Sequence, residues 1–244
     1  MAPGVVVVDN ASKVVQNLEG GVIAELLVRD GDHVKAGQVL VRLDDLEAKA
    51  LHDVLKGQWL ALAAQRARLL AERDDLQRLA FPAKLEALRG SPEMAEILSG
   101  QQRIFDSGRK ALEGQIDVLK QRIEAFKAEA AGLRAQLDSS HEQLSLIKEE
   151  LAGVRGMVEK GLEPRPRLLE LQRNASELRG QQGDLKSRIA QVQENASGVA
   201  LEIINARQAR TKQAAIDLRD VETKAAETGE RLAEAKAKLA RRDV

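Results

Sequence analysis

Three histidines and several adjacent acidic residues are the side chains of this sequence that could act as general acids, general bases or metal ligands. The histidines lie far apart: His33, His52 and His141. The acidic residues occur as neighbouring pairs: Asp44-Asp45, Asp74-Asp75 and Glu149-Glu150. Neighbours in a helix point about 100° apart, so these pairs do not share one proton-transfer site. With no cysteine and no glycine-rich phosphate loop, the sequence predicts no catalytic or metal site, and we expect a protein that is not an enzyme.

The elements that would position any site are helices, and one of them has a narrow apolar seam. Apolar residues recur at alternating steps of four and three from Leu112 to Val158, with one polar member, Ser140. A mean spacing of 3.5 residues is typical of a coiled coil. At about 1.5 Å per residue, a helix over residues 108–160 would be on the order of 75 Å long. We therefore expect the functional sites to lie at the two ends of this long helix.

A second seam follows after a break in the helical pattern. Lys160 and Gly161 suit a helix C-terminus, and Pro164 and Pro166 prevent direct continuation. The new seam starts at Leu171, shifts phase by a stutter after Ala206 and continues to Leu239. Two matching seams joined by a short turn predict an antiparallel helical hairpin.

Folding the chain about this turn brings the polar members of the two seams together. It places Leu144 opposite about Gln182, with Ser140 one layer away. A buried polar layer fixes the register of a coiled coil at some cost in stability. The sequence therefore predicts that Ser140 and Gln182 specify how the two helices pair.

A third helix precedes the hairpin and has two apolar stripes, which predict contact with more than one neighbour. Phe81-Pro82 ends it, and Ser91-Pro92 is typical of a helix start. These breaks divide the chain into a β-rich region (1–43), a first helix (44–79), a linker or elbow (80–93), a second helix (94–160), a tip (161–166), a third helix (167–241) and a final stretch (242–244).

The composition agrees with long helices and excludes some partners. Three Phe, one Trp and no Tyr leave little bulk for a large globular core. Lysine plus arginine balance aspartate plus glutamate at 38 each, so there is no electrostatic footprint for nucleic acid. No signal peptide and no run of 18 apolar residues is present, so we expect this stretch to be soluble, with any membrane anchor outside it.

The β-rich region contains glycine turns between apolar runs. The residues that define it are Gly21, Gly31, Asp32, Val34, Gly37 and Leu40. Gly31 and Gly37 supply backbone freedom at two bends, and we expect Val34 between them to point inward. At these spacings the region resembles the first half of a biotinyl/lipoyl-type β-sandwich. The fold class expected is mainly α: a long antiparallel coiled-coil hairpin with a third helix and a small β half-domain.

The β half-domain, with Gln16 to Gly21 before it and Leu43-Asp44-Asp45 leading into a helix, resembles the haemolysin-D-like membrane fusion proteins, or periplasmic adaptors, of type I secretion. The resemblance implies an inner-membrane ABC transporter, a TolC-like outer-membrane channel and an exported polypeptide as partners. It also implies a hexameric ring, a periplasmic location, an inner-membrane anchor before residue 1, and further β domains after Val244. The second lipoyl half would then begin near 242–244.

The same resemblance points to three residues at the predicted tip: Arg165, Leu169 and Ser176 match the Arg-Leu-Ser pattern with which such adaptors meet the channel. Leu169 would supply an apolar knob, and Arg165 a multi-donor fork for carbonyls or carboxylates. The alternative is that these are ordinary solvated or seam-flanking residues.

Two further questions concern cofactors and other functions. Lipoyl and biotinyl domains carry their cofactor on a lysine where the two halves join, but here that joint opens into the first helix; Lys35 lies in an earlier turn. We therefore predict no covalent cofactor. The alternatives for function are an efflux-type adaptor for small molecules, which would share the hairpin and tip, and a purely structural coiled coil.

Overall fold

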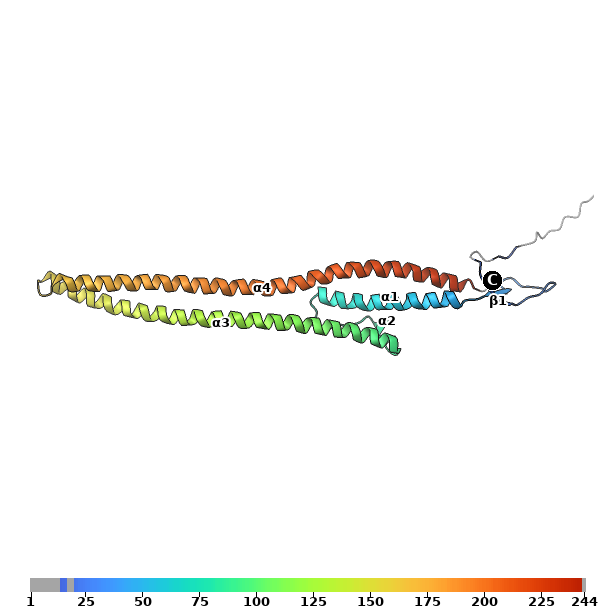
Figure 1. The fold of residues 1–244 in the computed structure, drawn as a ribbon, viewed down its shortest axis with the longest axis horizontal. Helices are drawn as coiled ribbons and strands as arrows, with labels where there is room; N and C mark the ends of the chain where they lie inside the picture. The colour runs from blue at the N-terminus through green and yellow to red at the C-terminus, as the bar shows by residue number, and fades with distance from the viewer. Residues whose placement is uncertain (1–13, 17–19, 243–244) are drawn as a thin grey trace, which may run out of the picture. The chain divides into compact units, whose positions relative to one another are not determined.

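The structure, a computed structural model, describes residues 14–16 and 20–242 of the chain. The start of the β-rich region, residues 1–13, lies outside these residues. The described elements are β1 (Ile23–Leu26), β2 (Val41–Leu43), α1 (Leu46–Arg73), α2 (Ala83–Glu86), α3 (Pro92–Glu159) and α4 (Arg165–Ala240), as Figure 1 shows. The prediction of a mainly α protein with a long helical hairpin is confirmed. The chain forms two compact units, residues 104–212 and residues 1–103 with 213–244.

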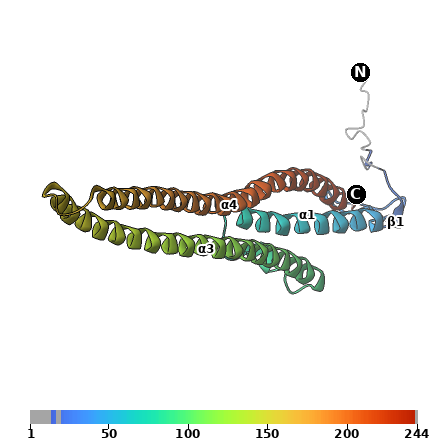
Figure 2. The same ribbon diagram turned by 60° about the vertical axis from the view of Figure 1, so that its left-hand side comes forward.

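The unit of residues 104–212 is the helical hairpin. Within it α3 and α4 run side by side in opposite directions and are joined by a short turn (Figures 1 and 2). Their contact is a row of apolar side chains taken alternately from both helices. One of its clusters consists of Ala130, Leu133, Ile189 and Val192, with Phe126, Leu137 and Leu185 packed against it. These residues belong to the two seams, so the 3.5-residue spacing forms the contact.

The hairpin turn begins at the C-terminus of α3. Gly161 has a φ of +72°, a left-handed conformation that suits glycine. Its N–H donates to the carbonyl oxygen of Val158, and the N–H of Leu162 donates to that of Met157, at 3.0 and 2.9 Å. This Schellman motif satisfies two carbonyl groups that the end of the helix would otherwise leave without partners.

The register of the hairpin differs from the expected one. Gln182 donates a hydrogen bond from Nε2 to the backbone carbonyl oxygen of Ser140 at 3.0 Å, and both residues are buried. Gln182 thus lies directly across from Ser140, and the expectation of Leu144 opposite Gln182 was wrong. The reason is that α4 already begins at Arg165, so the chain folds back earlier than a tip extending to residue 166 would allow.

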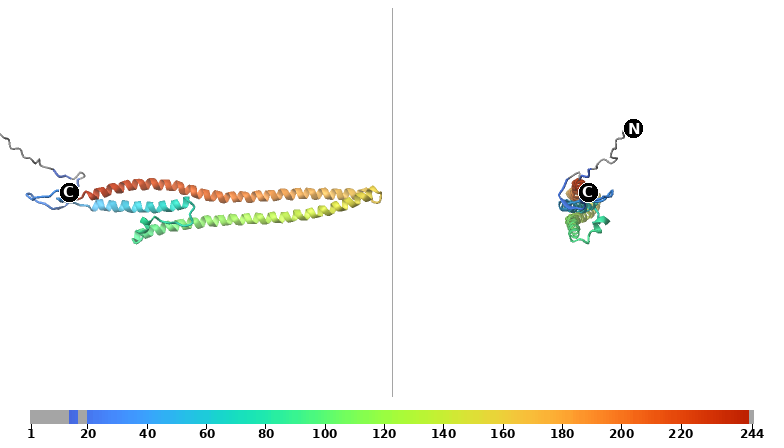
Figure 3. Two further views of the ribbon diagram at one scale, coloured as in Figure 1. Left: turned by 180° about the vertical axis from the view of Figure 1, so that it is seen from behind. Right: turned by 90° about the vertical axis from the view of Figure 1, so that its right-hand side faces the viewer.

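The second unit packs α1 between two groups of neighbours (Figure 3). On one side, Leu69 of α1 forms a buried cluster with α4 residues Ala214, Leu218 and Val221. On another side, Ala64 forms a buried cluster with Leu85, Met94 and Leu98, from α2 and the start of α3. The two apolar stripes of α1 therefore each have a neighbour.

The segment between α1 and α3 is more structured than a plain linker. α1 ends at Arg73, not near residue 79, because Asp75 adopts a left-handed φ of +49° and closes a second Schellman motif. The short helix α2 follows, and α3 starts at Pro92. There the hydroxyl of Ser91 accepts the N–H of Met94 at 3.3 Å, as an N-cap side chain does.

The β region forms a two-stranded antiparallel ribbon among the described residues. Ile23 pairs with Leu43, Glu25 with Arg42 and Leu26 with Val41, with an irregularity between Ile23 and Glu25. This ribbon is smaller than the four-strand half of a lipoyl-type sandwich. Two strands offer one ladder of backbone bonds, and a hairpin of this size is marginal in water without something packed on it.

Candidate docking sites at the hairpin tip and the β ribbon

The tip of the hairpin presents the three residues that the sequence singled out on the first turns of α4. Arg165 is the first residue of α4 and is exposed, and Leu169, one turn later, is 53% exposed. Ser176 lies about two turns farther, and its hydroxyl donates to the carbonyl oxygen of Gln172 at 2.9 Å. The guanidinium of Arg165 and the side chain of Leu169 thus face solvent at one end of the hairpin.

Sequence reasoning missed the exposed apolar side chains of the turn and of the last turn of α3. Leu162 is 72% exposed and Met157 is 43% exposed, although a leucine that follows a left-handed glycine often packs back onto the last turn of the helix. The signal available in the sequence was a leucine inside a loop with a glycine and two prolines. Together with Leu169, these residues give the turn an apolar surface beside Arg165, called here the tip surface.

Arg167 holds the two helices together below this surface. Its guanidinium donates to the Glu150 carboxylate on α3 at 2.5 Å and to that of Glu170 on α4 at 3.1 Å. The hydrogen bonds of Glu150 and Glu170 raise the pKa of Arg167 above its ordinary value. Arg167 is therefore neutralised within the hairpin, whereas Arg165 forms no ion pair or hydrogen bond with any residue that the structure describes.

The β ribbon holds the glycine turns of the second candidate site. Gly31 and Gly37 have φ values of +94° and +83°. Asp32 accepts the N–H of Arg29 through its carboxylate at 2.8 Å, and its own N–H donates to the Arg29 carbonyl oxygen. The carbonyl oxygen of Leu40 accepts the N–H of Leu27 at 2.9 Å, which extends the ladder beyond β1 and β2.

Apolar side chains of this region face solvent. Val34 is 51% exposed, because the described residues do not cover its side chain. The expectation that it points inward was therefore wrong. Val22, Ile23 and Leu26 are 73%, 59% and 66% exposed. Gly21, in contrast, lies close to another side chain, because a Cβ atom added there would lie 3.2 Å from Leu43 Cδ1. The ribbon thus presents an apolar surface that two strands alone do not bury.

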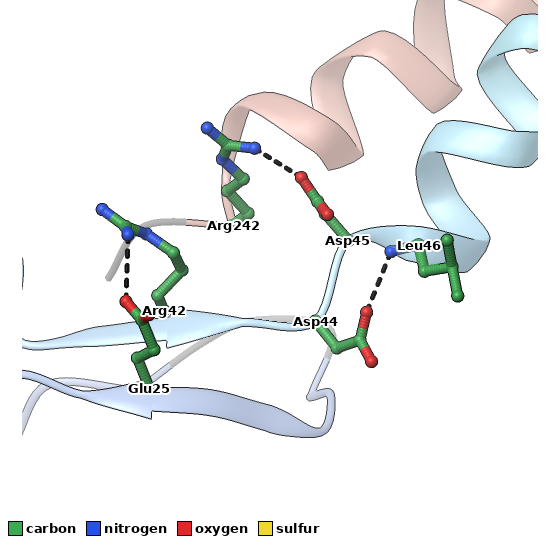
Figure 4. A network of polar contacts seen from close by, with 6 residues as sticks. All are labelled: Glu25, Arg42, Asp44, Asp45, Leu46 and Arg242. Carbon is green, nitrogen blue, oxygen red and sulfur yellow. Dashed lines mark hydrogen bonds and ion pairs between the residues drawn. The ribbon is translucent and has the colours of Figure 1, made fainter.

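Polar contacts join the ribbon to the helix ends, as Figure 4 shows. Arg42 pairs with Glu25 across the ribbon at 3.0 Å, and Asp44 accepts the N–H of Leu46 at the start of α1. Arg242 pairs with Asp45, and its carbonyl oxygen accepts the N–H of Leu43 at 3.0 Å. The last described residues therefore lie beside β2.

Metal-binding groupings are not found in the part of the chain that the structure describes. No group of three or more His, Asp or Glu side chains there could hold a metal ion. Of the helices described, none combines the length and apolar character needed to cross a membrane. What both candidate sites offer is exposed apolar surface with a few charged groups, which is suited to binding another polypeptide.

Comparison with known proteins shows which family has this hairpin. A family model described as "AprE, long alpha-helical hairpin" matches residues 48–238. The soluble domain of LipC, a membrane fusion protein of a type I secretion system, has the same fold with a TM-score of 0.86 and 32% sequence identity, over 92% of this chain and 84% of LipC. This chain belongs to the haemolysin-D-like membrane fusion proteins of type I secretion.

Other relatives and one further solved structure extend the comparison. The type I secretion membrane fusion protein PrsE of Rhizobium meliloti is 38% identical over the whole chain, and the alkaline protease secretion protein AprE of Pseudomonas aeruginosa is 29% identical over 97% of it. The chain spans only 56% and 55% of these two relatives. The periplasmic adaptor EmrA shares the fold at a TM-score of 0.52, but 21% identity carries no argument for a shared function.

Proposed function

We propose that this chain is the periplasmic part of an adaptor that links an inner-membrane ABC transporter to a TolC-like outer-membrane channel. A polypeptide would then be exported in one step, and the adaptor would work as a hexameric ring. The observation that carries the proposal is the tip surface: an exposed apolar turn at one end of a long hairpin, with an arginine that pairs with none of the described residues. Its chemistry suits the helix tips of a partner protein, because Leu169 offers an apolar knob and Arg165 several donors.

The relatives support export of a polypeptide as the function. AprE is named for the secretion of an alkaline protease, and PrtE of Dickeya chrysanthemi, 40% identical over 47% of this chain, for the secretion of proteases. Both names describe secretion of a protein. We therefore propose a protein as the cargo, in preference to the small molecules that an efflux-type adaptor would carry.

Two substitutions at the tip test the proposed docking. We expect Arg165→Asp and Leu169→Ser to abolish secretion, because they remove the donor fork and the apolar knob. Helicity and the melting temperature should not change, since both side chains face solvent. The assay is the amount of cargo in the medium of a strain that carries the full-length adaptor with its transporter and channel.

A matched control for the tip substitutions is Arg173→Asp, an exposed position two turns into α4 that lies outside the tip surface. It introduces the same charge change and should leave secretion intact. Normal secretion by Arg165→Asp and Leu169→Ser would remove the docking assignment.

We also propose that the β ribbon is the first half of a lipoyl-like domain, completed by chain that follows residue 244 in the full-length protein. The exposed apolar side chains of β1 and Val34 support this, and so does the position of Arg242 beside β2. A second half would cover these side chains and add strands to the ribbon. Lys35 remains a turn residue in this proposal, without a covalent cofactor.

Amide hydrogen exchange tests the completed domain. We expect the N–H groups of Ile23–Leu26 and Val41–Leu43 to exchange much more slowly in the full-length protein than in residues 1–244 alone. The cause is that only the longer chain would cover the ribbon. Equal exchange in the two proteins would contradict the proposal, with the amides of residues 130–137 in the hairpin as an internal reference.

A further inference from the structure

α3 has a second row of residues on the face turned away from α4. The row keeps alternating steps of three and four residues, so it runs parallel to the seam between the helices. We call it the α3 outer row: Ile104, Ser107, Ala111, Gly114, Val118, Gln121, Ala125, Ala128, Gly132, Ala135 and Ser139. All eleven are exposed, and none is charged in a chain with 31% charged residues. A solvated helix face is normally rich in charge, so this row has the composition of a contact surface.

α4 has a matching row on its own outward face. We call it the α4 outer row: Gly180, Gly183, Ser187, Ala190, Glu194, Ser197, Leu201, Ile204 and Gln208. All nine are exposed, and only Glu194 is charged. Each row has two large apolar side chains near one end. Ile104 and Val118 are 51% and 66% exposed, and Leu201 and Ile204 are 59% and 49% exposed.

The two rows lie at the same level of the hairpin and on opposite outer faces. Ser140 lies across from Gln182, which fixes the level at one end of the rows. Within one hairpin the rows cannot meet, because the α3–α4 seam lies between them. Small residues let helix axes approach to about 8 Å, at the close end of the usual range. Each row therefore has a surface on which another helix can pack closely. The other row has the residue sizes and the spacing that such a helix needs.

Charges along the edges of the rows identify the partner helix. Asp117, Glu124 and Asp138 form an acidic edge on the α3 row, and Arg179, Lys186 and Arg207 form a basic edge on the α4 row. Lys120 and Lys127 contact Asp117 and Glu124 within α3, whereas Asp138 has no polar partner among the described residues.

The basic edge is not neutralised inside the hairpin. Arg179, Lys186 and Arg207 make no ion pair or hydrogen bond with any described residue. Arg179 even lines a surface hollow together with Lys148 and Arg155. An acidic edge brought against Lys186 and Arg207 would supply these cations with partners.

We propose that the α3 outer row of one copy of this chain packs against the α4 outer row of a second copy, with the helices antiparallel. When two antiparallel helices meet along these rows, the acidic edge faces the basic edge. Asp117 then lies opposite Arg207 of the neighbouring copy and Asp138 opposite its Lys186. Both pairs fit one register, because 138 − 117 and 207 − 186 are both 21 residues.

The contact joins two different surfaces and is therefore heterologous. A heterologous contact repeats from copy to copy and generates a ring when the rotation closes. The inference thus deepens the proposed ring and rests on the proposed adaptor function, for which it names the surfaces that meet. The tip surface stays outside the contact, since both rows stop before it.

Engineered disulfides test this contact, and residues 1–244 contain no natural cysteine that would compete with them. We expect the full-length protein with Asp138→Cys and Lys186→Cys, oxidised in the cell envelope, to give dimers, trimers and higher species on a non-reducing gel. Separate chains with Asp138→Cys and Lys186→Cys should give dimers only when expressed together. Crosslinking by Asp138→Cys alone would mean a symmetric contact and would overturn the proposal.

The matched control is the pair Arg134→Cys and Arg188→Cys, at the same level of the hairpin but outside both rows and their edges. It should stay monomeric, and a ladder equal to that of the test pair would overturn the proposal.

Charge reversal gives a second readout, measured as crosslinking of the Asp117→Cys and Arg207→Cys pair. Asp138→Lys and Lys186→Asp should each reduce this crosslinking, and the two reversals together should restore it. Unchanged crosslinking in the single reversals would also overturn it. Crosslinking does not depend on secretion, so normal secretion without crosslinks refutes only this contact, and crosslinks without secretion refute only the adaptor function.

Discussion

Trp59 on α1 lies against the backbone of Gly229 on α4, and this pair shows what a single residue decides in the packing of the helices. A Cβ atom at Gly229 would lie 3.6 Å from the indole Nε1 and 3.8 Å from Cδ1, which are ordinary van der Waals distances. The site therefore has room for a methyl group and for little more. Trp59 remains 39% exposed, so its fluorescence reports on this contact.

Gly229→Ala should raise the free energy of unfolding by about 0.5–1 kcal/mol, because alanine costs less conformational entropy in a helix and its methyl group fits under the indole ring. Gly229→Leu should lower the melting temperature and shift Trp59 emission to longer wavelength, because the larger side chain displaces the ring. Thermal unfolding and fluorescence spectra measure both effects.

Gly198→Ala is the control, since nothing lies within 4 Å of a Cβ atom there. It should give the same gain in stability without any change in fluorescence. A lower melting temperature for Gly229→Ala than for the unsubstituted protein would contradict the proposed fit.

At the scale of elements, the polar layer of the hairpin is the feature with the least obvious role. Gln182 bonds to the Ser140 carbonyl oxygen, but the Ser140 hydroxyl is buried without a hydrogen-bond partner among the described residues. A buried hydroxyl without a partner costs free energy. We therefore predict that this layer selects the register of the helices and does not add to their stability.

Replacing Ser140 and Gln182 together by leucine should raise the melting temperature by about 2–4 °C, as about 1 kcal/mol does in a chain of this size. The added side chains continue the apolar seam, and no polar group of the layer remains to be satisfied. A fall in the melting temperature would count against this view. Ser145→Leu with Gln181→Leu, two exposed neighbours of the same residue types, should leave the melting temperature unchanged.

At the scale of the whole molecule, the proposed adaptor needs a hairpin of defined length. Residues 104–159 of α3 lie in the hairpin unit and span about 80 Å at 1.5 Å per residue. No pocket is needed for this role, because the function depends on the distance between the partners that the two ends bind.

Deleting matched heptads tests the role of length. Removal of residues 120–126 from α3 and 196–202 from α4 keeps the seam and the Ser140–Gln182 layer, since these segments lie opposite each other. The hairpin becomes about 10 Å shorter. We expect normal helicity but loss of secretion, measured as cargo in the medium.

Deletion of residues 120–126 alone is the control for register. It should lower the melting temperature, because the rest of α3 then faces the wrong layers of α4. Secretion at the normal rate by the matched deletion would show that length is not what the hairpin supplies.

The sequence by itself determined the helices and their antiparallel pairing, because 3.5-residue periodicity, Gly161 and the tip prolines are local signals. The glycine motif of the β region carried the resemblance to the family. The sequence also singled out the tip residues and the polar pair Ser140 and Gln182. The functions of these residues remain predictions. Only the tertiary structure decided the register of Ser140 with Gln182, the end of α1 at Arg73, the exposure of Leu162 and the ion pair of Arg167 with Glu150. These features depend on which side chains meet across the turn or between helices, and residues far apart in the chain specify them jointly.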